Sequence, residues 1–230
     1  MFLKLLDEED TTYLRNQLTN KKFADGTKTQ NISKFYDIKQ NKETTVPEKV
    51  RKYLIDLLYN HSYIDSVYCP NRVSVNFYNR YTEGDFYDYH IDSFKASPKS
   101  NNVFYDYGFS INLNDDYEGG EFIVKTEAGE VGCQLQTGQA AVFPIIFPHK
   151  VSKVTKGIRE NIIGWFSSNV SYEQFYILKY LQESSMTLTQ LMKKDDEISK
   201  VYNDLLLNNT LVQNYLKKLW GKYHGKDKSI

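Results

Sequence analysis

The stretch Arg80-Tyr81-Thr-Glu-Gly-Asp-Phe-Tyr-Asp-Tyr-His90-Ile-Asp92 carries the strongest indication of both fold and chemistry in this chain. Residues two apart in an extended strand point to the same face, so we expect the His90 imidazole and the Asp92 carboxylate side by side. A second histidine, His149, follows in Phe-Pro-His-Lys. Two neutral imidazoles and one carboxylate, with the other metal positions open, are typical of non-haem Fe(II) that activates O₂. The sequence therefore predicts an iron site.

Alternation of apolar and polar residues on both sides of this stretch indicates β structure. Val73, Val75 and Phe77 alternate with polar neighbours, which is the pattern of a half-buried strand. Further strand-like segments lie at 104–114, 121–125, 139–147 and 159–167, and glycine-rich turns separate several of them. Many short strands joined by such turns indicate a sandwich or barrel, here over about residues 66–168.

Helical periodicity flanks this β region. Asp7 to Leu18 predicts a first helix with Asp7 as N-cap, and Val46-Pro47-Glu48 opens a second. Beyond Asn169 the spacing is helical, and the apolar stripes there fit either dimerisation or packing on the sheet. We expect a mainly β chain with flanking helices (α+β). It would comprise a domain at 1–168 and a C-terminal helical region at 169–230, with the oligomeric state open and a homodimer included.

Composition excludes several classes of partner. Lys plus Arg and Asp plus Glu both number 29, so the zero net charge offers no global electrostatic reason to bind nucleic acid or anionic lipid. The longest apolar runs fall well short of the roughly 20 residues of a membrane span, and the N-terminus does not resemble a signal peptide. Two cysteines, Cys69 and Cys133, are too few for a disulfide framework. We expect a cytoplasmic protein with reduced thiols.

Arg159, ten residues after His149, is the candidate for binding an anionic co-substrate. An α-keto acid that chelates iron leaves its far carboxylate in need of a cation, and the planar guanidinium pairs with a carboxylate through two hydrogen bonds. A lone arginine is usually a solvated surface residue, and a lone strand histidine is usually a packed or exposed one. The spacing of Arg159 from His149 favours a functional role for the arginine over that of a solvated surface residue.

The motif Arg80-Tyr81-X-X-Gly84-X-X-Tyr87-X-X-His90-X-Asp92 resembles that of prolyl 4-hydroxylase-like 2-oxoglutarate/Fe(II) dioxygenases. Three further stretches are similar to the PKHD-type hydroxylases: Gly119-Gly120-Glu121-Phe122, the run from His149 through Gly157 to Arg159, and Trp165-Phe166-Ser167-Ser168. Segments 5–9, 25–29 and 38–41 also look like the leader region of that family. The resemblance thus covers most of the chain before the C-terminal helices.

This resemblance implies a double-stranded β-helix, or jelly-roll, core with N-terminal support helices. It implies that the iron ligands are His90, Asp92 and His149. It implies that Arg159 binds the C5 carboxylate of 2-oxoglutarate.

Three further positions match the family's co-substrate pocket. Tyr81 matches a tyrosine that contacts the co-substrate in prolyl hydroxylases. Asn112 stands where some of these enzymes place a tyrosine on the same carboxylate. Trp165 falls where a pocket-lining aromatic is often found.

The activity implied is hydroxylation of an unactivated C–H bond with O₂, coupled to decarboxylation of 2-oxoglutarate to succinate, with ascorbate as an expected accessory. Family likeness favours a prolyl residue in a peptide or protein as the substrate, and the loop 93–102 as a substrate lid. A small-molecule or free amino-acid hydroxylase remains an alternative. So do a non-catalytic jelly-roll binding module and a cupin-like metal protein with other chemistry.

Overall fold

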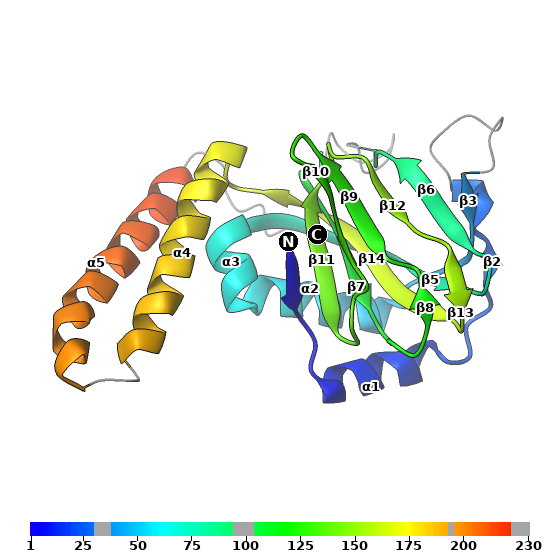
Figure 1. Ribbon diagram of the computed structural model, residues 1–230, viewed down its shortest axis with the longest axis horizontal. Coiled ribbons are helices and arrows are strands. Elements are labelled where there is room, and N and C mark those ends of the chain that lie inside the picture. The colour runs from blue at the N-terminus through cyan, green and yellow to red at the C-terminus, as the bar shows by residue number, and fades with distance from the viewer. Residues whose placement is uncertain (30–37, 94–103, 193–195, 222–230) are drawn as a thin grey trace. The chain divides into compact units, whose positions relative to one another are not determined.

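The computed structural model describes residues 1–29, 38–93, 104–192 and 196–221 (Figure 1). The chain forms two compact units. The first comprises Met1–Asp56 and Val73–Ser167, and the second comprises Leu57–Arg72 and Ser168–Ile230. The domain division at 168 and 169 that we expect from the sequence stays a prediction. The expected lid, 93–102, lies almost wholly outside the described residues.

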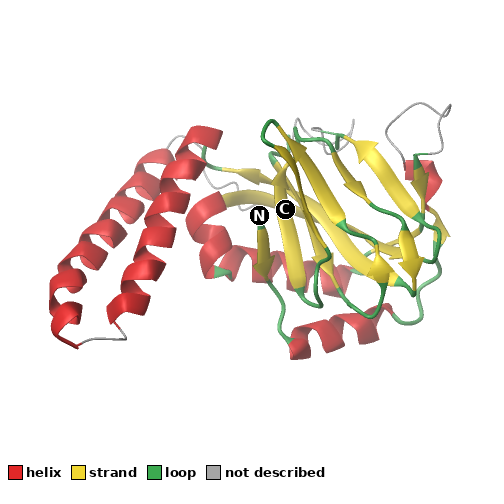
Figure 2. Cartoon of the chain, viewed as in Figure 1, coloured by secondary structure: helices red, strands yellow, loops and turns green. Residues whose placement is uncertain are grey.

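Two antiparallel sheets dominate the first unit (Figures 1 and 2). The seven-stranded sheet has the order β1 (Phe2–Lys4), β11 (Gln139–Pro144), β7 (Tyr107–Asn112), β14 (Arg159–Ser168), β5 (Pro70–Tyr81), β4 (Lys42–Thr45) and β2 (Ala24–Asp25). The five-stranded sheet has the order β10 (Gly129–Cys133), β9 (Phe122–Thr126), β12 (His149–Val151), β6 (Phe86–His90) and β3 (Lys39–Gln40). A small sheet pairs β13 (Val154–Lys156) with β8 (Glu118–Gly119). This is the predicted jelly-roll core.

Strand β14 shows how the sequence alternation builds the core. Ile162 and Phe166 are completely buried, whereas Asn161, Ile163 and Trp165, which lie on the other face of the strand, line a cavity. Gly164 lies where the neighbouring strands approach closely. A Cβ there would be 2.2 Å from the Ser74 carbonyl oxygen of β5 and 2.4 Å from the Phe109 ring of β7. The glycine thus lets three strands pack tightly behind the cavity.

The predicted N-terminal helices are confirmed. Helix α1 (Glu8–Leu18) begins at the N-cap Asp7, whose side chain accepts from the Asp10 backbone while Asp10 accepts from that of Asp7. A 3₁₀ turn, η1 (Gly26–Thr29), follows β2. Helix α2 (Glu48–Asn60) starts directly after Pro47. The two α-helices meet through the rings of Tyr13 and Tyr53, whose centroids are 5.2 Å apart.

The second unit is helical. It contains α3 (Ser62–Tyr68), α4 (Tyr172–Met192) and α5 (Asp196–Gly221). Helix α3 falls partly in the segment from residue 66 that the sequence assigns to the β core, and the first core strand begins only at Pro70. Tyr68 of α3 packs on Phe175 of α4, with ring centroids 4.9 Å apart. Among the described residues, no helix is long and apolar enough to cross a membrane.

Candidate metal centre and co-substrate pocket

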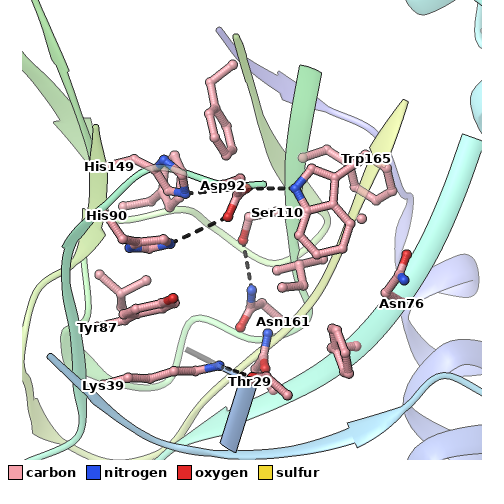
Figure 3. A pocket seen from close by; sticks show the side chains of 18 of the residues that line it. Thr29, Lys39, Asn76, Tyr87, His90, Asp92, Ser110, His149, Asn161 and Trp165 are labelled. Atoms are coloured by element: carbon pink, nitrogen blue, oxygen red, sulfur yellow. Dashed lines mark hydrogen bonds and ion pairs between the residues drawn. The ribbon is translucent and has the colours of Figure 1, made fainter. Parts of the chain in front are cut away.

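Three side chains with metal-binding atoms meet in the cavity of the first unit (Figure 3). His90 ends β6 and His149 begins β12, and the two are direct partners in the antiparallel ladder. Asp92 follows β6, with its carboxylate oxygens 3.7 Å from His90 Nε2 and 3.6 Å from His149 Nε2. One ligand atom of each residue lies within 4.8 Å of the others, so a single ion can contact all three. Within the described part of the chain, this is the one group of its kind.

Both imidazoles present Nε2 to the metal position because their Nδ1 atoms are engaged elsewhere. His90 Nδ1 lies 2.8 Å from the Asp88 carbonyl oxygen, and His149 Nδ1 lies 3.1 Å from that of Phe147. A neutral ring that donates through Nδ1 keeps its lone pair on Nε2. Burial, and then the neighbouring His149, lower the pKa of His90 to about 3, and burial also lowers the pKa of His149. Both rings are therefore neutral at neutral pH, as metal ligation requires.

The carboxylate of Asp92 is held from the opposite sheet. Trp165 Nε1 on β14 donates a hydrogen bond to Asp92 Oδ2 at 2.7 Å. Such a bond restricts the rotation of the carboxylate and keeps it directed at the two histidines. Trp165 also lines the cavity, at the position where the sequence predicts a pocket aromatic.

The cavity next to these ligands has a volume of about 300 Å³. Six of its lining side chains are aliphatic or phenylalanine and come from both sheets: Phe77, Phe109, Phe122, Phe143, Val151 and Ile163. A pocket of this size and lining excludes water from most of a small ligand. Polar side chains, the three candidate ligands among them, make up much of the rest of the lining.

Arg159 is completely buried at the first residue of β14. Its Nη1 donates to Asn161 Oδ1 at 2.9 Å, and Asn161 Nδ2 in turn donates to Ser110 Oγ at 2.8 Å. Its Nε and Nη2 atoms are buried and have no hydrogen-bond partner. These two nitrogens form one edge of the guanidinium, the edge that binds a carboxylate through two parallel hydrogen bonds. An unpaired buried cation of this kind fits an anionic co-substrate.

The glycine pair Gly119-Gly120 provides room for this arginine. Both residues have positive φ angles, 72° and 62°. A Cβ on Gly120 would be 2.9 Å from Arg159 Cδ, and one on Gly119 would be 2.3 Å from the Lys153 carbonyl oxygen. The Gly-Gly-Glu-Phe stretch therefore owes its glycines to the close approach of the Arg159 side chain and the Lys153 backbone.

Tyr81 and Asn112 occupy different environments. Tyr81 is buried, lines the cavity, and lies with its ring centroid 5.4 Å from Arg159 Cζ. Asn112 pairs with Asn161 across β7 and β14, but it is not among the lining residues. Its Nδ2 contacts the carbonyl oxygens of Asn114 at 2.5 Å and Leu135 at 2.6 Å. Its amide nitrogen thus contacts the backbone, and the expected role of Asn112 on the co-substrate carboxylate stays a prediction.

Several polar lining residues were not predicted from the sequence, among them Thr29, Lys39, Ser110 and Asn161. The strand alternation from Arg159 to Trp165 was a usable signal for Asn161, which lies between them on the same face. Thr29 and Lys39 come from η1 and β3, in a region whose sequence is polar and ambiguous, so no pattern indicated that they reach the cavity.

The donor set and its surroundings define a class of protein. The model of the 2OG-Fe(II) oxygenase superfamily matches residues 76–167, which include all three candidate ligands and Arg159. A PKHD-type hydroxylase of Alteromonas mediterranea is 30% identical over 215 residues, covering 88% of this chain and 95% of the relative. Another from Idiomarina loihiensis is 29% identical over 217 residues, covering 90% and 97%. This chain belongs to the PKHD-type hydroxylases and is a dioxygenase.

A solved structure supports the fold. The prolyl hydroxylase of Trichoplax adhaerens, in complex with a hypoxia inducible factor oxygen degradation domain peptide fragment, superimposes with a TM-score of 0.58. The match covers 77% of this chain and 86% of that one at 18% identity. At this identity the likeness concerns the jelly-roll fold.

Proposed function

We propose that this enzyme hydroxylates a prolyl residue of a peptide or protein, with Fe(II) bound by His90, Asp92 and His149. The donor set fits this ion, because two neutral imidazoles and one carboxylate on one side leave the opposite positions open. When bound, Fe(II) supplies the activation of O₂ that breaks an unactivated C–H bond. The protein holds the three ligands through the Asp88 and Phe147 carbonyls and Trp165.

The observation that carries the proposal is the unpaired edge of Arg159. A buried guanidinium with two free donors costs several kcal/mol unless an anion completes it. Its neighbours Tyr81 and Asn161 line the same cavity as the three candidate ligands. We infer that the C5 carboxylate of 2-oxoglutarate binds this edge, and that the co-substrate is decarboxylated to succinate as O₂ is consumed. Ascorbate would keep the iron reduced between turnovers.

The choice of a prolyl substrate is supported by the structural neighbour from Trichoplax adhaerens, a prolyl hydroxylase in complex with a peptide fragment. Cys69 and Cys133 are not joined in a disulfide, which suits a reducing, cytoplasmic compartment, and we include this compartment in the proposal.

The test is mass spectrometry of proline-containing peptides incubated with the enzyme, Fe(II), 2-oxoglutarate and ascorbate under air. We expect a mass gain of one oxygen atom on proline, with succinate formed in equal amount. Arg159→Met, which is close in length and apolar, is the matched control and should abolish both products. Succinate formation stimulated by free amino acids, with unmodified peptides, would instead assign a small-molecule substrate. Absence of succinate under all conditions would contradict the enzymatic role.

A further inference from the structure

A buried ion pair lies in the wall of the cavity and has no part in the chemistry described above. Lys39 Nζ is 2.9 Å from Glu43 Oε2, and the two side chains are only 5% and 6% exposed. Lys39 also donates to Thr29 Oγ1 at 2.7 Å. These residues belong to η1, β3 and β4, before the segment that the superfamily model matches. Burying two charges costs several kcal/mol each, and the pair offsets this only in part.

The ammonium of Lys39 lies against the aromatic residue that supports a candidate iron ligand. Lys39 is the cross-strand partner of Tyr87 in β3 and β6, and its Nζ is 4.9 Å from the centroid of the Tyr87 ring. The ring of Tyr87 stacks on that of His90, with centroids 3.5 Å apart and planes 8° from parallel. Figure 3 shows Lys39, Tyr87 and His90 in succession along one wall of the pocket. We call these three residues the His90 column.

The His90 column restrains the rotation of the His90 ring that the Nδ1 hydrogen bond does not restrict. The bond from Nδ1 to the Asp88 carbonyl fixes the direction of the imidazole but allows the ring to rock about it. A parallel aromatic face prevents this rocking. A cation on the far face of a partly buried tyrosine ring is attracted to it, the more so because Lys39 itself is shielded from water. Glu43 and Thr29 keep the cation in that place.

We propose that Lys39, held by Glu43 and Thr29, is a positioning residue that fixes the His90 ring through Tyr87. This rests on the proposed function, since it takes His90 to be a ligand. Removal of a residue that contacts a metal-ligating side chain commonly lowers the metal affinity by about 10–100-fold. Lys39 acts through Tyr87, so we place its effect near the lower end of that range.

The test measures the affinity and the visible absorption spectrum of bound Co(II), which serves as a spectroscopic probe without oxidative chemistry. The variant Lys39→Met/Glu43→Leu removes both charges together and leaves no unpaired ion in the interior. We expect its Co(II) affinity to fall about 10-fold and its visible absorption bands to shift, with the melting temperature nearly unchanged. Lys39→Gln/Glu43→Gln, which keeps polar side chains but no charge, should lose as much Co(II) affinity. It replaces the first variant in the test if that variant does not fold. Lys39→Arg, which keeps the positive charge, should give the same Co(II) spectrum as the wild type.

A double-mutant cycle with Tyr87 tests the route of the effect. Tyr87→Phe keeps the stacked ring and should bind Co(II) like the wild type, whereas Tyr87→Leu should lose affinity. Adding the charge-free substitutions to Tyr87→Leu should cause no further loss, because Lys39 acts on His90 only through the Tyr87 ring. Unchanged spectra in the charge-free variants, or fully additive losses, would overturn the positioning role. Failure of the wild-type protein to bind Co(II) would instead overturn the metal site itself.

Discussion

The indole nitrogen of Trp165 lies 2.7 Å from Oδ2 of Asp92, and this hydrogen bond joins the two sheets at the candidate metal centre. Trp165 belongs to β14 of the seven-stranded sheet, whereas Asp92 follows β6 of the five-stranded sheet. The bond engages one oxygen of the Asp92 carboxylate and restrains the rotation of that carboxylate. The metal site thereby depends on the correct packing of both sheets.

Trp165→Phe should lower the affinity for Fe(II) or Co(II) about 10-fold, because Asp92 loses the donor that orients it. The ring remains apolar, so the free energy of unfolding should change little. Competition titration with a chelator measures the affinity, and urea unfolding measures the stability. Trp220→Phe, which changes the other tryptophan of the chain, is the control and should bind metal like the wild type. Equal affinity in both variants would show that the hydrogen bond is dispensable.

Arg159→Lys should raise the KM for 2-oxoglutarate while leaving metal affinity intact. Lysine keeps the positive charge but cannot form two parallel hydrogen bonds to one carboxylate. Loss of one charged hydrogen bond costs about 1.5–3 kcal/mol, which corresponds to about 10–150-fold in KM. Steady-state succinate formation at varied 2-oxoglutarate measures this, with Co(II) titration alongside. A wild-type KM would remove Arg159 from the co-substrate site.

Asn161→Asp probes how Arg159 is held. The side chains have nearly the same shape, but an aspartate beside Arg159 Nη1 would pair with the guanidinium and reduce its attraction for a second carboxylate. We expect weaker 2-oxoglutarate binding, seen by isothermal titration in the presence of Co(II), and an unchanged Co(II) affinity. Ser110→Ala, which removes only the partner of Asn161, should have a smaller effect. Tighter co-substrate binding in the aspartate variant would contradict this account.

Gly164→Ala should destabilise the fold without touching any proposed ligand. The added Cβ would be 2.2 Å from a backbone oxygen, which cannot move away as a flexible side chain can. Overpacking of this kind costs about 1–3 kcal/mol, measurable as a shift of the urea midpoint. Lys42→Ala, at an exposed position of β4, should stay within about 0.5 kcal/mol of the wild type. Equal stability of the two variants would mean that the strands around Gly164 adjust easily.

The sequence predicted best where local periodicity coincides with local structure. The Asp7 N-cap, the start of α2 and the alternation along β14 all follow from neighbouring residues. The approach of His90, Asp92 and His149 was predictable from spacing and family likeness together. Helix α3 was missed, because its seven residues precede a strand directly and β-branched residues extend across the boundary.

Contacts between distant segments were beyond the sequence. Lys39 lies near Tyr87 only because β3 pairs with β6 at the edge of the five-stranded sheet, and this pairing depends on the whole sheet. The same holds for the bond between Trp165 and Asp92, which requires both sheets to face each other. The role of Asn112 was expected by analogy with a tyrosine. The nitrogen of its shorter amide contacts nearby backbone carbonyls, which the sequence did not indicate, and its role at the co-substrate stays a prediction.

The most direct test of the central claim is the conversion of 2-oxoglutarate to succinate by wild-type protein, His90→Ala and Asp92→Ala, each with Fe(II) and O₂. Folding of each variant is checked by circular dichroism and Co(II) binding is measured in parallel. We predict succinate from the wild type, and from either variant only the amount formed by iron and 2-oxoglutarate without protein. Wild-type rates of succinate formation in folded His90→Ala or Asp92→Ala would contradict the assignment of this site.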